Sequence, residues 1–233
     1  VKFLKPEQVK EIWPLCNTEG LIGAIQHPED GYIQPADLTQ ALATGARNRG
    51  AEIYRNTTVI GIKQTKNGWV VETDKGSIEC EHVVSCTGNF ARQTGKMVGL
   101  EIPVIPVEHQ YIVTEPHPEI LKRKKDGLPE MGVLRDSDTQ WYMREEAGGL
   151  LLGPYEKGAP CCYVDGPSKD SEYELFQEDL ERLAPHIEGA IHRVPAFGEV
   201  GVKKVYNGAI CYTPDGNPIV GPAWGLKNFW INE

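Results

Sequence analysis

The chain has 233 residues, which is long enough for one or two domains with a sizeable core. Its net charge of -9 argues against a nucleic-acid binder, because neutralising phosphates requires a clustered excess of Lys and Arg. No run approaches the roughly 20 apolar residues that a membrane-spanning helix needs, so we expect no membrane span. The six cysteines are scattered without metal-ligand spacing, which is typical of a reducing compartment.

The beginning of the chain is predicted to alternate helices with short strands. Apolar residues at helical spacing indicate a helix over 6–15, and a strand is expected over 21–25. A second helix is predicted over 35–50 and a strand over 51–54. This helix and strand form half of a parallel crossover, whose closing strand we expect at 82–86.

Three short segments of alternating apolar residues lie between the two halves of this crossover. They cover 58–64, 68–73 and 77–80. Asn67-Gly68 and Asp74-Lys75-Gly76 separate them, and both are strong hairpin signals. The sequence therefore predicts a three-stranded antiparallel meander inserted into a parallel sheet.

The stretch Glu81–Phe90 combines a short apolar strand with an abrupt bend. Val83 and Val84 are followed by small residues, and Gly88 lets the backbone turn. In open α/β sheets, ligands lie beyond the carboxyl ends of the strands, often where a glycine lets the main chain approach closely. We therefore expect Ser85–Gly88 to contact a cofactor. The alternative is that Thr-Gly simply ends the strand without binding a ligand, which is common.

Beyond Pro103 the pattern changes from crossover type to meander type. A helix over 91–98 precedes this point, and an amphipathic helix is predicted over 171–184, where four apolar residues share one face. The change indicates two interleaved subdomains, and the uncapped end at Glu233 indicates an interior piece of a longer protein. Further strands are predicted at 107–114, 132–135, 140–145, 150–154, 197–206 and 228–231, with a turn at 213–216.

Two of these strands carry pairs of polar side chains at strand spacing. His109 and Tyr111 project to one face of their strand, and Tyr142 and Arg144 do the same on theirs. If both strands belong to one antiparallel sheet, that face suits a small anionic substrate that bears an amine. The alternative is structural: the first pair caps a sheet, and Arg144 pairs with a neighbouring glutamate at the surface.

Several catalytic signatures are missing from the sequence. It contains no G-x-S-x-G, H-E-x-x-H or Walker motif, so hydrolase and metalloenzyme functions have no support. The dinucleotide motif G-x-G-x-x-G is also absent, which by itself argues against a complete flavin or NAD domain.

Several motifs follow one another along the chain in a fixed order: Asp30-Gly31 to Pro35, Gly50–Ile53, Thr58-Val59, Val83–Gly88, Gly149–Gly153 and Tyr212–Gly221. Taken together, they resemble the D-amino-acid-oxidase type of FAD-dependent oxidoreductases. A second set comprises Gly88–Arg92, Gly95–Leu100, Glu108–Tyr111 running into Val113–Glu115, and the Thr213–Gly216 loop. Through this set the chain is most similar, within that group, to the dimethylglycine and sarcosine dehydrogenases.

The resemblance implies a fold of class α/β and α+β. An incomplete FAD-binding Rossmann-like domain, residues 28–103 and 210–233, would be interleaved with a substrate domain. The latter, residues 1–27 and 104–209, would be built on a mostly antiparallel sheet with flanking helices. The missing glycine motif is then explained by truncation, because the family's amino-terminal Rossmann unit lies upstream.

The resemblance also assigns site residues. Val59, Thr87, Gly88 and Phe90 would contact FAD. His109 and Tyr142 match the family's active-site histidine and tyrosine, whereas Arg144 has no secure family role. We expect the two active-site side chains to face a common hollow from adjacent strands.

The implied reaction is FAD-dependent demethylation of a small N-methylated amino acid such as dimethylglycine or sarcosine, in the cytoplasm or the mitochondrial matrix. A hydride passes from the N-methyl carbon to the flavin, and water or folate captures the resulting iminium. Any folate-binding domain would lie outside this chain, and the electron acceptor is undetermined. The alternative is a non-catalytic regulatory protein of the same fold.

Overall fold

The computed structural model describes residues 1–168, 171–172 and 174–233, which form two compact units. The division follows contacts within the chain, and each unit is assembled from three segments. The first unit comprises Val1–Ile33, His109–Ala159 and Leu175–Gly208, and the second comprises Gln34–Glu108, Pro160–Glu174 and Ala209–Glu233.

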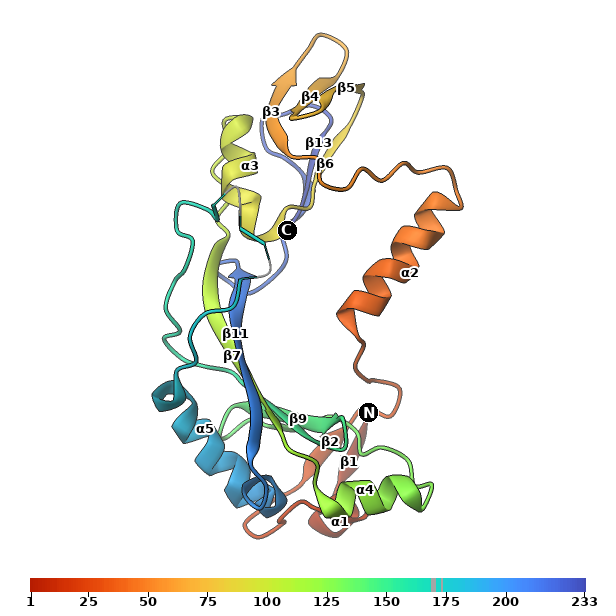
Figure 1. Ribbon diagram of the computed structural model, residues 1–233, viewed down its shortest axis with the longest axis vertical. Coiled ribbons are helices and arrows are strands. Elements are labelled where there is room, and N and C mark those ends of the chain that lie inside the picture. The colour runs from red at the N-terminus through yellow and green to blue at the C-terminus, as the bar shows by residue number, and fades with distance from the viewer. Residues whose placement is uncertain (169–170, 173) are drawn as a thin grey trace. The chain divides into compact units, whose positions relative to one another are not determined.

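A five-stranded sheet in the order β11-β7-β10-β9-β8 organises the first unit, with β7 and β11 running side by side (Figure 1). Leu152 on β10 pairs antiparallel with Ile112 on β7 and with Met143 on β9, which fixes the register across the middle of the sheet. The strands span Ile105–Thr114 (β7), Leu134–Asp136 (β8), Trp141–Glu146 (β9), Gly149–Pro154 (β10) and Val202–Tyr212 (β11).

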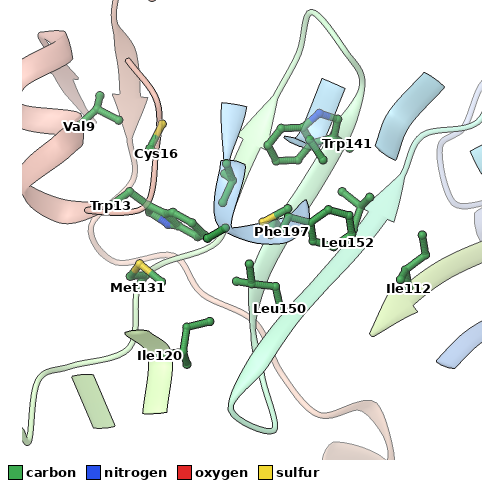
Figure 2. Packing of buried hydrophobic residues seen from close by; sticks show 14 of the residues in the cluster. Val9, Trp13, Cys16, Ile112, Ile120, Met131, Trp141, Leu150, Leu152 and Phe197 are labelled. Atoms are coloured by element: carbon green, nitrogen blue, oxygen red, sulfur yellow. The ribbon is translucent and has the colours of Figure 1, made fainter. Parts of the chain in front are cut away.

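One face of this sheet is covered by the core of the first unit. Ile112, Met143 and Leu152 are fully buried in that core, together with side chains from helices and loops (Figure 2). Burial of such apolar side chains contributes roughly 1.5–3 kcal/mol for each large one. The other elements of the unit are β1 (Lys2–Leu4), α1 (Pro6–Ile12), β2 (Ala24–Gln26), α4 (Pro118–Lys125), α5 (Leu180–Arg193) and the short helix η2 (Pro195–Gly198).

The second unit holds two three-stranded sheets. One is the antiparallel meander β3-β4-β5, and in the other β13 pairs parallel with β6 and antiparallel with β12. Trp69 and Phe229 meet edge to face at 5.2 Å in its core. The elements are α2 (Pro35–Arg47), β3 (Val59–Gln64), β4 (Trp69–Thr73), β5 (Gly76–Cys80), β6 (Val83–Ser85), η1 (Gly88–Phe90), α3 (Ala91–Met97), β12 (Val220–Pro222) and β13 (Phe229–Asn232).

The fold class predicted from the sequence is confirmed: helices combine with mostly antiparallel sheets. The meander, the helices that begin at Pro6, Pro35 and Ala91, and the turn at Thr213 also form where the pattern placed them. Within the described residues, no helix has both the length and the apolar character needed to cross a membrane.

The predicted helix over 171–184 is wrong for most of its length. Its Tyr173 lies outside the described residues, and residues 174–179 are not helical. The backbone there bonds elsewhere: the Phe176 N–H donates to the Asn207 carbonyl at 2.8 Å, and the Asn207 amide donates to the Gln177 carbonyl. The helix α5 begins only after Asp179, whose carboxylate accepts the Arg182 N–H as an N-cap.

The predicted strand over 51–54 is also wrong, and so is the crossover that depended on it. All four residues are exposed and irregular, because the described chain offers them no partner strand. The parallel partner of β6 is β13. Other strands are displaced: β2 begins at Ala24 rather than at 21, and β8 begins at Leu134 rather than at 132. The strand β11 begins at Val202 because η2 occupies the start of the segment predicted from 197.

Candidate functional site

The bend after β6 is an anion-binding cradle in the second unit. The backbone N–H groups of Thr87 and Gly88 donate to the Glu233 carboxylate at 2.9 and 2.7 Å. The hydroxyls of Ser85 and Thr87 donate to the same carboxylate at 2.6 and 2.9 Å. A side chain that follows β13 in the same chain therefore satisfies the donors of this bend.

The remaining surface of the bend fits the close approach of a cofactor. Gly88 has φ +53°, and no atom lies within 4 Å of the position that a Cβ would take. The Asn89 side-chain oxygen is buried and has no hydrogen-bond partner among the described residues, and Phe90 is 37 % exposed. These features suit contact with a flat apolar group and one added donor, whereas a phosphate would have to displace Glu233.

Val59, the fourth residue expected to contact the cofactor, opens β3 in the same unit. Val59 pairs with Thr73 of β4, and the register between the two strands shifts between Val59 and Gly61. The main chain of Val59 therefore lies next to an irregularity in the β3–β4 pairing. Its side chain is 39 % exposed. The four expected cofactor residues thus all belong to the second unit.

The predicted face of polar side chains forms in the first unit. Tyr142 pairs with Gly153, and Arg144 pairs with Leu151, which itself pairs with Val113. Because side chains alternate along strands, His109 and Tyr111 lie on the same face as Val113 and therefore as Tyr142. The expectation of adjacent strands is wrong, however, since β10 lies between β7 and β9.

Gly153 explains how Tyr142 spans the strand between them. A Cβ at this glycine would lie 2.1 Å from Cζ of the Tyr142 ring and 2.4 Å from its hydroxyl oxygen. The ring therefore lies directly across β10, where any other residue would exclude it. The glycine thus brings the phenol toward β7.

A second pair of rings extends the face. Tyr111 stacks on Tyr206 of β11 with ring centroids 4.7 Å apart and 16° between the planes. Burial raises the pKa of the Tyr111 phenol, and the neighbouring Tyr206 and Tyr142 raise it further. Tyr111 therefore keeps its proton at neutral pH and is available as a hydrogen-bond donor.

Arg144 is held in place on this face by two neighbours. Its Nη1 lies 2.5 Å from the Glu146 carboxylate, and its guanidinium lies 4.3 Å from the centre of the Tyr32 ring. The Tyr32 hydroxyl in turn donates to Glu130 at 2.9 Å. The pairing with a neighbouring glutamate, which the structural alternative predicted, does occur and offsets part of the positive charge.

His109 lies half-buried at the start of the first unit's part of β7. Burial lowers the pKa of its imidazole below 6.5, Glu156 opposes this shift, and Arg182 adds to it. The imidazole is therefore neutral at physiological pH and can accept a proton. In the described part of the chain, no group of His, Cys, Asp or Glu is placed to hold a metal ion.

Three contributors to this face were missed at the sequence level. Tyr206 comes from a strand whose pairing with β7 leaves no local signal, and Tyr32 reaches Arg144 from an irregular segment between β2 and α2. Gly153 appears in the sequence only as one position of a predicted strand. The Gly149–Gly153 motif was noted for its resemblance, but its spacing alone does not reveal a ring lying across it.

Comparison with known proteins now identifies the family. The model of the family described as "DAO: FAD dependent oxidoreductase" matches residues 1–233. The chain belongs to the DAO family of FAD-dependent oxidoreductases.

Relatives within the DAO family include mitochondrial dimethylglycine dehydrogenase of Rattus norvegicus, 39 % identical over 98 % of this chain. Mitochondrial sarcosine dehydrogenase of Mus musculus is 33 % identical over 98 % of the chain. The mitochondrial pyruvate dehydrogenase phosphatase regulatory subunit of Mus musculus is 32 % identical over 99 %. The chain spans only 27 %, 24 % and 26 % of the lengths of these proteins.

A solved structure supports the fold. The L-proline dehydrogenase from P. horikoshii superposes with a TM-score of 0.82 at 27 % identity, covering 99 % of this chain and 58 % of that one. The match to the family model confirms the resemblance to the DAO type that was drawn from the motifs.

Proposed function

We propose that the complete protein carries out FAD-dependent oxidation of a small N-methylated amino acid such as dimethylglycine or sarcosine. The single observation that carries the proposal is the register of β7, β10 and β9, which supports one shared face for His109, Tyr111 and Tyr142. Two relatives named as dehydrogenases of such amino acids support the same substrate class.

On this proposal, the side chains of the face bind and orient the substrate. The Tyr142 and Tyr111 hydroxyls hydrogen-bond to its carboxylate, and the Arg144 guanidinium adds positive charge nearby. The neutral His109 imidazole accepts the proton of the substrate ammonium, because only a nitrogen with a free lone pair can support loss of a hydride from its methyl carbon. Water, or folate bound outside this chain, then captures the iminium.

The second unit would hold the cofactor through Val59, Thr87, Gly88 and Phe90. FAD supplies the two-electron acceptor when it is bound. Within the bend, the open flank of Gly88 and the buried Asn89 oxygen support a contact through backbone and ring rather than through phosphate. The proposal leaves the final electron acceptor unnamed.

We also propose a reducing compartment, either the cytoplasm or the mitochondrial matrix. The described cysteines are all free thiols, and the names of the relatives above place those proteins in mitochondria. The non-catalytic alternative is not favoured, because both His109 and Tyr142 are present and lie on one face of the sheet.

The test uses the full-length protein purified with FAD. Under anaerobic conditions, dimethylglycine or sarcosine should bleach the absorbance of the oxidised flavin. Glycine betaine is the matched control, since its quaternary nitrogen has no lone pair and should leave the flavin oxidised. A colourless protein, or a flavin that no N-methylated amino acid reduces, would overturn the proposal.

A further inference from the structure

We infer that Glu156 and Arg182 form a largely buried ion pair that positions His109 through the backbone of Gln110, the next residue on β7. The inference rests on the proposed function, in which His109 accepts the proton of the substrate. The pair acts through the backbone of β7 rather than on the substrate, so both are positioning residues.

Glu156 follows β10 and is almost completely buried, with 2 % of its side chain exposed. Its carboxylate accepts hydrogen bonds from Arg182 Nε at 2.7 Å and from the Gln110 backbone N–H at 3.1 Å. A buried carboxylate is costly unless it is paired and fully hydrogen-bonded, and these donors meet that requirement.

Gln110 links this pair to the histidine. The N–H that Glu156 accepts belongs to the peptide joining His109 to Gln110, so the bond fixes the backbone immediately after the imidazole. The Gln110 side chain is fully buried and exchanges two hydrogen bonds with the backbone of Asp179, at 2.8 and 3.2 Å. The strand is thereby held at this residue by both the segment after β10 and the start of α5.

The two charges of the pair shift the pKa of the imidazole in opposite directions. Glu156 raises the pKa of His109 and Arg182 lowers it, against the larger lowering by burial. Asp179 lies 3.7 Å from Arg182 and contributes a second carboxylate on that side. On β11, the strand on the other side of β7, Tyr206 stacks on Tyr111, and the Lys204 ammonium lies 4.4 Å from the centre of the Tyr206 ring.

Packing alone does not account for the pair. Two apolar side chains of similar volume would fill the same space without the cost of burying charges, and such replacements are often neutral or stabilising. The charges are placed beside the one histidine that the proposed reaction needs. Removing one charge therefore changes the protonation of His109 in a direction set by its sign.

The experiment measures anaerobic single-turnover flavin reduction at saturating substrate as a function of pH, in the full-length holoenzyme. The midpoint to be compared is the pH at which the reduction rate is half-maximal on the acidic limb of the profile. Glu156→Gln keeps the shape of the side chain and removes its negative charge, so this midpoint should move to lower pH. Arg182→Gln should move it to higher pH, whereas Arg182→Lys keeps the charge and should leave the midpoint in place. Opposite shifts in the two charge-removing variants support the inference.

The matched control is Asp136→Asn, which breaks another largely buried ion pair of the same unit, Asp136 with Arg193 at 3.2 Å. It should lower the melting temperature and leave the midpoint unchanged. If Glu156→Gln does not fold, the comparison of Arg182→Gln with Arg182→Lys decides alone. The inference is overturned if removing either charge leaves the midpoint at the wild-type pH while His109→Ala slows reduction. If His109→Ala reduces flavin at the wild-type rate, the proposed function fails instead.

Discussion

At the scale of single residues, Gly153 is a position where the absence of a side chain has a functional consequence. Gly153→Ala would place a methyl group inside the Tyr142 ring, so the ring must leave its position across β10. We expect overpacking to cost about 1–3 kcal/mol and the substrate dissociation constant to rise. Stopped-flow substrate titration measures this constant, and Gly132→Ala is the control because its added Cβ meets no atom within 4 Å. Substrate binding as tight as in wild type would contradict the assigned position of Tyr142.

The Tyr142 hydroxyl gives a second prediction at this scale. Tyr142→Phe keeps the ring over Gly153 and removes the hydrogen bond that we assign to the substrate carboxylate. The dissociation constant should rise by the equivalent of about 1–3 kcal/mol, the usual value for a hydrogen bond to a charged group. Tyr155→Phe serves as the control. Tyr155 directly follows β10, and the centre of its ring lies 5.7 Å from that of Tyr142. Identical substrate titrations for Tyr142→Phe and wild type would rule the hydrogen bond out.

Residue-level features were only partly predictable from the sequence. The alternation of side chains along a strand was sufficient to place His109 with Tyr111 and Tyr142 with Arg144. It did not reveal the intervening strand, because strand order is decided by long-range pairing. Gln110 and Glu156 lie 46 residues apart, and no local pattern indicates that a buried glutamate meets that strand.

At the scale of elements, the start of α5 is set by a cap rather than by the apolar pattern. Asp179 accepts the Arg182 N–H, and replacing such an N-cap by Ala costs about 1 kcal/mol. Asp179→Ala should therefore lower the free energy of unfolding by this amount in urea. The neighbouring exposed Glu178→Ala should change it little. Equal stability of the Asp179→Ala protein and wild type would show that the cap is not what starts the helix.

Elements that depend on local signals could be predicted from the sequence, whereas elements decided by long-range contacts could not. The meander β3-β4-β5 follows from Asn67-Gly68 and Asp74–Gly76, since turn residues and alternation act over a few positions. Residues 174–179 carry a helical pattern but bond to the backbone and side chain of Asn207. Here a long-range contact outweighs a local preference.

At the scale of the whole molecule, the family followed from several motifs in a fixed order, whereas the absence of one motif was misleading by itself. The chain covers 27 % of the length of the rat dehydrogenase. Within these residues, the cradle at Thr87 and Gly88 is filled by Glu233.

A protein made of residues 1–233 alone should bind FAD only weakly. These residues contain no G-x-G-x-x-G motif, the glycine-rich turn that holds a pyrophosphate at a helix N-terminus. Titration of FAD fluorescence with the purified fragment measures the affinity, and the full-length protein provides the comparison. A fragment that purifies yellow and keeps its colour on dialysis would contradict this expectation.

On the proposed function, His109 accepts the proton of the substrate on the face of the first unit's sheet that also carries Tyr111 and Tyr142. The most direct measurement is the rate of anaerobic flavin reduction by substrate in a single turnover of full-length His109→Ala, with bound FAD quantified in the same sample. We predict that reduction becomes much slower while the bound FAD stays near the wild-type amount. An unchanged rate in the fully loaded variant would contradict the account.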